Sequence, residues 1–261
     1  MQDQYVGDVG DFGKYGLLRY LCGLREDSKG PSLSLGVVWY LMPNGGGNDG
    51  KHLSYLHHPP KNRHRDRFRG CDDLLYESLY DIIFDGAYPE VQKGRRTVSA
   101  IQGASILRDA VFFDDPLTVD GLQVDRTAWS RDAITRLNHC DVVFADPDNG
   151  LELPSGPGPK HASFSELGRY LQNGRSLVVY HHLSRNGSAD DQIRSCASQL
   201  RERLGIGGDI ISLRYRRGTA RAFFIIPNGR ERVLNERIDA FLDGPWGREK
   251  VGGRPHFQRV S

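Results

Sequence analysis

The sequence lacks several features that would place a protein in a special class. No apolar run in its 261 residues approaches the roughly 20 residues of a membrane-spanning helix, so we expect no membrane contact. The first residues, Met1-Gln2-Asp3-Gln4-Tyr5, lack the basic and then apolar pattern of a signal peptide. The four cysteines are scattered, without the paired spacing of a zinc site or a disulfide framework: Cys22, Cys71, Cys140 and Cys196. We therefore expect reduced thiols in a cytoplasmic protein.

The sequence also has little net charge. Its 35 Lys and Arg residues against 33 Asp and Glu residues give +2, so no global basic field indicates nucleic-acid binding. Basic residues are nevertheless concentrated in two segments, residues 61–69 (KNRHRDRFR) and 214–221 (RYRRGTAR). Arginines clustered among aromatics are typical of contact with phosphates and bases, and equally typical of a solvated face.

Short apolar segments alternate with amphipathic ones along the chain. Strands are predicted at residues 33–41, 110–116, 142–145 and 176–183, helices at 11–22, 71–84 (ending near Gly86), 126–137, 163–171, 190–204 and 231–242, and a hairpin at 209–215 and 221–227; residues 97–101 fit either state. This alternation predicts one α/β domain with a largely parallel sheet, an antiparallel C-terminal hairpin and a helical insertion around residues 51–95.

The most informative stretch is residues 141–152 (DVVFADPDNGLE). Four apolar residues before an acidic turn with Pro and Gly predict a buried parallel strand that ends at a site. Ligands of open α/β sheets bind outside the carboxyl ends of the strands, which makes Asp146, Asp148 and Asn149 candidates for chemistry. His181 and His182 end the next predicted strand. A solvated acidic loop is the alternative interpretation.

Two other segments also suggest contact with a ligand. Residues 7–14 (GDVGDFGK) place two carboxylates and Lys14 among three glycines where the first helix begins, with Asp11 as its expected N-cap. Glycines of this kind suit a backbone that approaches a ligand. The strand at 33–41 ends in MPNGGGNDG, which fits a nucleotide cradle or an ordinary flexible loop, without the spacing of either common glycine-rich phosphate motif.

These motifs, in this order, resemble the bacterial large-subunit ribosomal RNA adenine-N6 methyltransferases, which have the Rossmann-like class I methyltransferase fold. Residues 7–14 match the family's Gly-Asn-x-x-Asp-x-x-Lys segment, residues 40–50 its glycine-rich turn, and Asp146-Pro147-Asp148-Asn149 its Asp-Pro-Pro-Tyr motif. The chain is also similar to bacterial proteins of unassigned function that share Gly-Asp-x-Gly-Asp-Phe and Asp-Pro-Asp-Asn-Gly. The family's acidic residue at the end of the first strand is absent.

The resemblance implies transfer of a methyl group from S-adenosylmethionine to nucleic acid, at an adenine amino group. Asp146 and Asn149 would accept hydrogen bonds from that amino group, with Asp148 and His181 completing the candidate catalytic set. Asn149 replaces the tyrosine that stacks on the flipped base in the family, and Tyr180 or Phe164 would supply stacking instead. The candidate cofactor-binding residues are Asp11, Lys14, Tyr40, Pro43, Asn44, Asn48, Asp49, Asp114 and Asp115.

Within that set, Lys14 would pair with the cofactor carboxylate, and Asp114 or Asp115 would hold the ribose hydroxyls.

Two other functions fit the same residues. A metal-dependent nuclease or phosphodiesterase would use carboxylates and imidazoles at the carboxyl edge of the sheet, namely Asp8, Asp11, Asp146, Asp148, Glu152, His181 and His182. A non-catalytic module would read nucleic acid through the basic loops, and the altered catalytic motif favours that interpretation.

Overall fold

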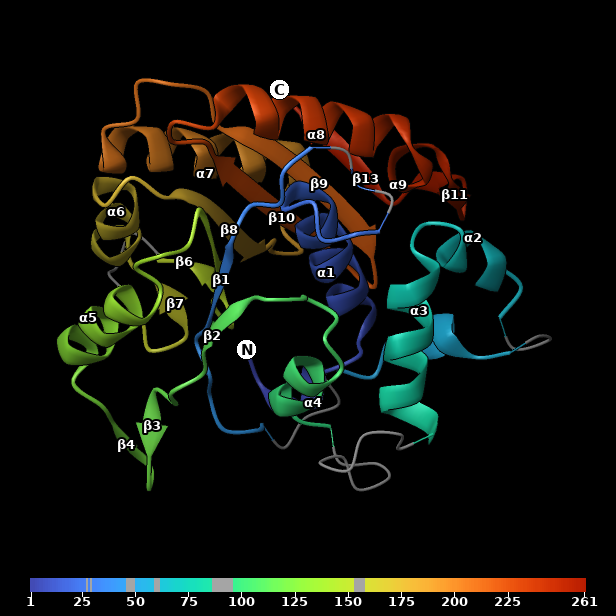
Figure 1. Ribbon diagram of the computed structural model, residues 1–261, viewed down its shortest axis with the longest axis horizontal. Helices are drawn as coiled ribbons and strands as arrows, with labels where there is room; N and C mark the ends of the chain where they lie inside the picture. The colour runs from blue at the N-terminus through green and yellow to red at the C-terminus, as the bar shows by residue number, and fades with distance from the viewer. Residues whose placement is uncertain (27, 29, 46–49, 59–61, 86–95, 153–157) are drawn as a thin grey trace.

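The structure is a computed structural model that describes residues 1–26, 28, 30–45, 50–58, 62–85, 96–152 and 158–261. Its central element is a seven-stranded sheet of order β13-β9-β10-β8-β5-β1-β2 (Figure 1). The strands are β1 (Leu35–Trp39), β2 (Val111–Phe113), β5 (Val142–Asp146), β8 (Ser176–His182), β9 (Ile211–Arg217), β10 (Thr219–Ile226) and β13 (Phe257–Val260). β2, β1, β5 and β8 are parallel neighbours, whereas β10, β9 and β13 run antiparallel to the strands beside them. The predicted α/β class, with a parallel core and antiparallel C-terminal strands, is confirmed.

Helices cover both faces of this sheet. One face packs against α1, α3, α8 and α9 and carries Val37 and Phe144, and the other packs against α5, α6 and α7 and carries Val38 and Val143. The helices are α1 (Val9–Leu21), α2 (Arg65–Arg69), α3 (Asp73–Tyr80), α4 (Val98–Gly103), α5 (Arg126–Arg136), α6 (Phe164–Gln172), α7 (Ala189–Leu204), α8 (Glu231–Asp243) and α9 (Pro245–Arg248). None of the helices in the described part of the chain has the length and apolar character needed to cross a membrane.

Short helical turns and two-stranded ladders complete the described elements. They are η1 (Asp3–Tyr5), η2 (Ser54–Leu56), the π-helical turn η3 (Asp81–Asp85), β3 (Thr118–Val119) with β4 (Leu122–Gln123), β6 (Gly150–Leu151) with β7 (His161–Ala162), and β11 (Lys250–Val251) with β12 (Arg254–Pro255). α2, α3 and η3 follow β1 and precede β2, within the segment where a helical insertion is expected (Figure 1).

The alternation of side chains along the strands decides which residues can meet at the carboxyl edge. Val142 and Phe144 of β5 lie in the core beneath α1, so Asp146, two positions further on, points to the same face. In β8 the same alternation puts Tyr180 and His182 on the α1 face. The register pairs Ala145 with Val179, so β5 ends beside Tyr180 and β8 continues further, to His182.

α1 is almost completely buried, which explains its unusual glycine content. Every residue of this helix except Tyr20 is buried. A Cβ atom added at Gly13 would lie 2.6 Å from the ring of Tyr215, and one added at Gly16 would lie 2.2 Å from the ring of Trp246. Glycine at these two positions therefore lets the helix backbone approach aromatic side chains of its own chain.

Most predicted elements are present, with three informative differences. The first helix begins at Val9, so the expectation that Asp11 caps it is wrong: Oδ1 of Asp8 accepts the N–H of Gly10 at 2.8 Å, and Asp11 lies in the first turn. The predicted helix at residues 71–84 becomes α3 and then a π-helical turn, and Gly86 lies outside the described residues. The strand β13 was not predicted at all.

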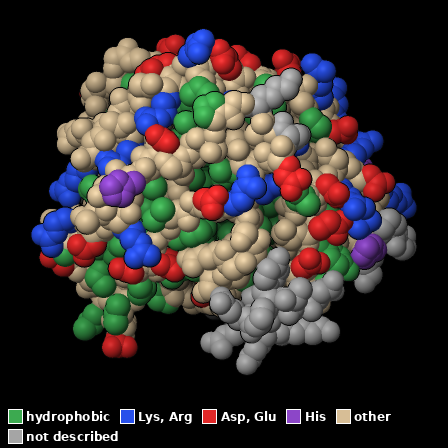
Figure 2. Space-filling view, viewed as in Figure 1, with side chains coloured by type: hydrophobic (Ala, Val, Ile, Leu, Met, Phe, Trp, Pro, Cys, Tyr) green, Lys and Arg blue, Asp and Glu red, His purple; other side chains and the backbone are tan. Residues whose placement is uncertain are grey.

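The surface and the cysteines agree with the composition. Figure 2 shows acidic and basic side chains interspersed over the described part of one face, as expected for a net charge of +2.

All four cysteines are free thiols, three of them buried and Cys196 partly exposed. The prediction of a chain without disulfides is confirmed.

Candidate functional site

The first turns of α1 meet the carboxyl ends of β1, β5 and β8 in a small pocket. β1 is followed in the chain by β2 on one side, while β5 lies on its other side, so the connections of the sheet diverge between β1 and β5. Such a switch point is the usual ligand site of open α/β sheets. The pocket is lined by Met1, Tyr5, Asp8, Gly10, Asp11, Lys14, Asp146, Pro147, Asp148, Tyr180, His182 and Arg221.

Lys14 is the central cation of this pocket. Its Nζ atom lies 2.8 Å from Oδ2 of Asp146, 3.3 Å from Oδ1 of Asp11 and 4.4 Å from the centre of the Tyr180 ring. Burial by itself lowers the pKa of Lys14, but the Asp146 and Asp11 carboxylates outweigh burial and hold the pKa above its usual value. Lys14 therefore carries a permanent positive charge in a buried site.

Two of the acidic side chains differ in ways that matter for chemistry. Burial raises the pKa of Asp11 to about 6, although the Lys14 ammonium opposes that change. Asp11 is also fixed in place, because its Oδ2 accepts the N–H of Gly7 at 3.1 Å. Asp146 is 1 % exposed, and its Oδ1 atom has no hydrogen-bond partner within the described structure. An unpartnered carboxylate oxygen of this kind is available to a donor on a ligand.

Met1 occupies the pocket. Its α-amino group donates to the carbonyl oxygen of Tyr40, the first residue after β1, at 2.9 Å and to that of Asp146, the last residue of β5, at 3.3 Å. The carbonyl oxygen of Met1 accepts the N–H of Met42 at 2.9 Å, and its Sδ atom lies 3.8 Å from Nζ of Lys14. With Met1 in this position only about 20 Å³ remains, roughly the room of one water molecule.

Asp148 is part of the pocket, and Asn149 lies at its mouth. Oδ2 of Asp148 accepts from the Gln2 amide at 2.6 Å and lies 3.0 Å from Nζ of Lys160. Burial alone would raise the pKa of Asp148, but the Met1 ammonium, Gln2 and Lys160 together lower it. Asn149 is exposed, and its side chain lines a neighbouring hollow of about 390 Å³.

The two histidines at the end of β8 have different surroundings. Nδ1 of His181 accepts the N–H of Leu151 at 3.0 Å, and its Nε2 lies 3.5 Å from Sγ of Cys196. The structure thus places His181 on the face away from the pocket, outside the catalytic set predicted for it. His182 lines the pocket, and burial, with Arg221 and Lys14 nearby, lowers its pKa to about 3. His182 is therefore a neutral imidazole at physiological pH.

The hollow beside the pocket shares five lining residues with it, namely Tyr5, Asp8, Asp148, His182 and Arg221. Arg221 is 7 % exposed and lies 3.7 Å from Oδ1 of Asp8, and its Nε atom has no partner in the described structure. Ser184 and Thr219 complete the polar part of the hollow. These side chains place hydrogen-bond donors and acceptors in the hollow next to the pocket that contains Asp146.

Of the predicted cofactor residues in the turn after β1, the structure describes Pro43 and Asn44, and neither lines the pocket. Pro43 lies in irregular chain, and Oδ1 of Asn44 accepts the backbone N–H of Gln4 at 3.0 Å, beside the N-terminal segment. Asn48 and Asp49 lie outside the described residues.

The two acids after β2 lie away from the pocket. Asp114 accepts from the Gln102 amide at 2.9 Å, and both Asp114 and Asp115 line a separate hollow with Arg136. Their place at the carboxyl end of the strand next to β1 matches the prediction, but neither side chain faces Lys14.

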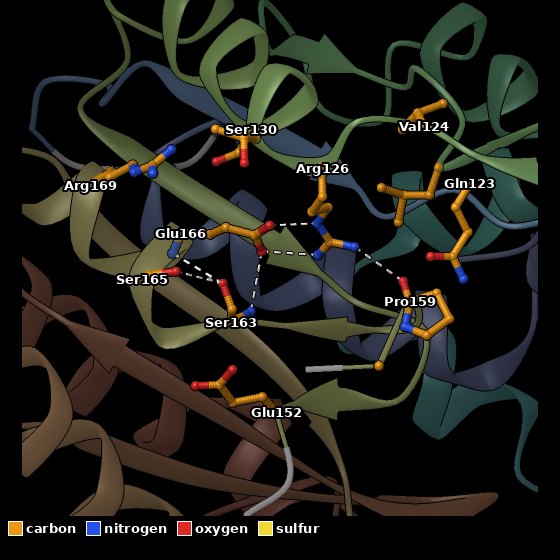
Figure 3. A pocket seen from close by; sticks show the side chains of 13 residues that line it. Gln123, Val124, Arg126, Ser130, Glu152, Pro159, Ser163, Ser165, Glu166 and Arg169 are labelled. Carbon is orange, nitrogen blue, oxygen red and sulfur yellow. Dashed lines mark hydrogen bonds and ion pairs between the residues drawn. The ribbon is translucent and has the colours of Figure 1, made fainter. Parts of the chain in front are cut away.

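Tyr40 contributes only its backbone to the Met1 pocket. Its side chain points to the opposite face, where the Arg126 guanidinium lies 4.9 Å from the ring centre. Arg126 pairs with Glu166 through two of its nitrogens, next to a hollow of about 490 Å³ between α5 and α6 (Figure 3). Phe164 is buried in the core on the same face as the Tyr40 ring and does not line the pocket, whereas Tyr180 does line it.

Several contributors to the site were not predicted as members of it, among them Met1, Gln2, Tyr5, Lys160 and Arg221. Met1 and Gln2 carry no local signal, because the carbonyl groups of Tyr40 and Asp146 and the carboxylate of Asp148, which accept from them, are far away in the chain. Arg221 appeared only as part of a basic cluster, and its pairing with Asp8 arises from the tertiary fold. Among the described residues, no group of three or more His, Cys, Asp or Glu side chains has an arrangement that could hold a metal ion.

Comparison of the chain with protein-family models, with curated proteins and with solved structures found no match to any of them. The function is therefore inferred from the residues of this pocket.

Proposed function

We propose that this chain is an S-adenosylmethionine-dependent methyltransferase that acts on nucleic acid, with an adenine amino group as the acceptor. One observation carries the proposal: the pocket holds the α-amino nitrogen of a methionine between two backbone carbonyls, beside the unpartnered Oδ1 of Asp146. S-adenosylmethionine, when bound, supplies a methyl group on a sulfonium centre. Parallel strands followed by antiparallel C-terminal strands agree with the class I methyltransferase fold that the sequence resemblance implies.

The polar groups of the pocket suit the methionine part of this cofactor. The carbonyl oxygens of Tyr40 and Asp146 would accept from its ammonium group, as they accept from Met1. Lys14 would pair with its carboxylate. Without Met1, the lining has four carboxylates (Asp8, Asp11, Asp146 and Asp148) against Lys14 and Arg221. Such a lining favours a ligand with net positive charge, as a sulfonium amino acid has.

Asp146 and His182 would orient the acceptor. An exocyclic amine conjugated to a ring is a poor nucleophile, and a hydrogen bond from its N–H to a carboxylate helps to localise the nitrogen lone pair. Oδ2 of Asp146 is held by Lys14, which leaves Oδ1 to accept that N–H. Asn149 stands where the family has its tyrosine, and the neutral ring of His182 lines the same hollow of about 390 Å³ as Asn149. Most of the rate gain would then come from positioning.

The proposal requires that the N-terminal residues leave the pocket. Met1 fills the space, and the Gln2 amide is bonded to Asp148. The competition between this segment and the cofactor lowers the measured affinity for S-adenosylmethionine by the fraction of molecules in which the pocket is open.

Calorimetric titration tests the proposal. The purified full chain, free of metal, is titrated with S-adenosylmethionine and separately with manganese. We expect binding of the cofactor that is lost in Lys14→Ala and unchanged in Arg131→Ala, which removes an exposed cation of α5. Binding of manganese with no binding of the cofactor would contradict the proposal and favour a metal-dependent nuclease.

A further inference from the structure

The two basic segments of the sequence, some 150 residues apart, meet in one hollow. Asn62, Arg63, His64 and Phe68 come from the first segment, and Arg217 and Gly218 come from the second. The hollow measures about 410 Å³, and its remaining lining residues are Val9, His52, Ser54, Tyr55 and Val251. No carboxylate belongs to this described lining, in contrast to each of the other four hollows discussed above.

Arg217 is a buried cation whose contacts are all neutral. It is 8 % exposed, and its guanidinium donates to Nδ1 of His256 at 3.0 Å, to the carbonyl oxygen of Arg254 at 2.8 Å and to that of Arg216. No described carboxylate forms an ion pair with it. His256 is fully buried, and burial, with Arg217 beside it, lowers its pKa to about 3, so it adds no counter-charge. A buried cation without a counter-ion is unfavourable unless an anion binds near it.

Two arginines of the first segment that lie outside the hollow are paired with acids, whereas Arg67, also outside it, donates to the carbonyl oxygen of Lys250 and forms no ion pair with a described carboxylate. Arg65 lies 3.6 Å from Oε1 of Glu77, and Arg69 pairs with both Asp73 and Glu77 on α3. Arg63 is exposed and forms no ion pair with a described carboxylate. Arg65 and Arg69, whose acidic partners lie on α3, are outside the hollow. Arg63 and Arg217, which line it, form no ion pair with a described carboxylate.

The hollow also adjoins the proposed acceptor site. His52 lines both this hollow and the one that contains His182 and Arg221, and its backbone N–H donates to Oδ2 of Asp8 at 3.1 Å. Gly218, at φ +66°, allows the β9–β10 turn to pack against His52, because an added Cβ would lie 3.2 Å from the imidazole. An extended ligand could therefore pass from the Asp146 pocket over His52 to Arg63.

We propose that this hollow, lined by Arg63, His64 and Arg217, binds the phosphodiester backbone of a nucleic-acid strand whose target base enters the Asp146 pocket. The inference rests on the proposed function for the identity of that base. It assigns to the two basic segments a joint role in holding the strand next to the reacting nucleotide. Phosphate is the anion that clustered arginines and histidines of this kind recognise.

Fluorescence anisotropy of a labelled single-stranded oligonucleotide, without cofactor, tests this inference. RNA and DNA of one mixed sequence are compared at several salt concentrations. We expect Arg63→Ala to weaken binding of the preferred strand and to reduce the salt slope by about 0.7, the value for one phosphate contact on a single strand. That slope corresponds to about fivefold weaker binding at 0.1 M salt. Arg69→Ala, which removes an acid-paired arginine of the same segment, should bind as the unchanged chain does.

A second pair of variants leaves the buried arginine intact. Ser54 is exposed and lines the hollow, so Ser54→Glu adds a carboxylate there and Ser54→Gln adds a neutral side chain of the same size. We expect Ser54→Glu to weaken binding and Ser54→Gln to change it little. Oligonucleotide binding that is insensitive to both Arg63→Ala and Ser54→Glu would overturn the inference.

Two further outcomes separate this inference from the proposed function. Binding of inorganic phosphate without binding of any oligonucleotide would overturn the inference, because the hollow would then be a site for the free ion. Loss of oligonucleotide binding in Arg63→Ala would support it, even if calorimetry shows no S-adenosylmethionine binding. In that case the methyltransferase proposal alone would fail.

Discussion

The Nζ atom of Lys14 lies 2.8 Å from Oδ2 of Asp146, although 132 positions separate the two residues in the chain. The contact joins the first helix to the end of a central strand, in a site where both side chains are at least 95 % buried. Removal of one partner of a buried ion pair is strongly destabilising, because the other charge is then buried without compensation. The pair therefore links the stability of the protein to the residues that we propose for its chemistry.

Lys14→Ala should lower the free energy of unfolding by about 3–5 kcal/mol, the usual cost when one partner of a buried ion pair is removed. The change leaves Asp146 and Asp11 buried without their cation. Urea denaturation measures the effect, with Arg131→Ala as the control, since that exposed side chain should change stability by less than about 0.5 kcal/mol. Equal stabilities of the two variants would contradict a buried pair at this site.

Asp11 should make the protein less stable as the pH rises from 4 to 6. Its pKa is about 6 in the folded protein and 3.8 in the reference state, so the folded chain retains a proton that the unfolded chain releases. Stability from this group is thus fully present below pH 3.8 and is lost as the pH approaches 6.

Asp11→Asn removes this titration. We expect the stability of the variant relative to the unchanged protein to increase between pH 4 and pH 6, by at most about 1.4 kcal/mol per pH unit. Urea titrations of both proteins at half-unit intervals measure the difference, in which titrating groups distant from Asp11 cancel. A difference that is constant with pH would show that Asp11 has the same pKa in both states.

Gly16→Ala should destabilise the protein despite the better helix propensity of alanine. The added Cβ would lie 2.2 Å from the Trp246 ring, and overpacking of this kind costs about 1–3 kcal/mol, whereas alanine gains about 1 kcal/mol over glycine within a helix. Thermal denaturation compares it with Gly207→Ala, where nothing lies within 4 Å of an added Cβ. A variant at position 16 as stable as the unchanged protein would show that α1 packs less tightly against α9.

Gln2→Ala should strengthen the binding of S-adenosylmethionine. The Gln2 amide donates to Asp148 at 2.6 Å and helps to hold Met1 in the pocket. A hydrogen bond to a charged group contributes about 1.5–3 kcal/mol, so its loss favours the open pocket by about tenfold or more. Calorimetry measures the affinity, and an unchanged or weaker affinity would indicate that the N-terminal segment does not compete with the cofactor.

The local part of this site was predictable from sequence. The apolar run at residues 142–145 before an acidic turn correctly located a central strand and its carboxyl end, because burial on both faces leaves a continuous apolar pattern. Lys14 and Asp11 were recognised from their setting among glycines. The start of α1 was placed two residues late, since both Asp8 and Asp11 are possible caps and only the tertiary contacts of Asp8 distinguish them.

The other features of the fold and the site depended on contacts between residues far apart in the chain. β13 reads as a polar basic tail because only Phe257 is well buried in it, and β9 supplies the pairing that makes it a strand. Which of His181 and His182 faces the pocket depended on how far β8 extends. The strand runs through both residues, so their side chains point to opposite faces and only His182 lines the pocket. The occupation of the pocket by Met1 has no sequence signal, because the carbonyl groups that accept from its amino group belong to Tyr40, just after β1, and to Asp146, at the end of β5.

The central claim is tested most directly by following the methyl group. The protein is incubated with isotopically labelled S-adenosylmethionine and single-stranded RNA or DNA, and the digested nucleosides are analysed by mass spectrometry. We predict labelled N6-methyladenine nucleoside from the unchanged protein and none from Asp146→Asn, which keeps the shape of the side chain and removes its charge. Cofactor binding without any labelled nucleoside, or equal labelling by a folded Asp146→Asn variant, would contradict the proposed function.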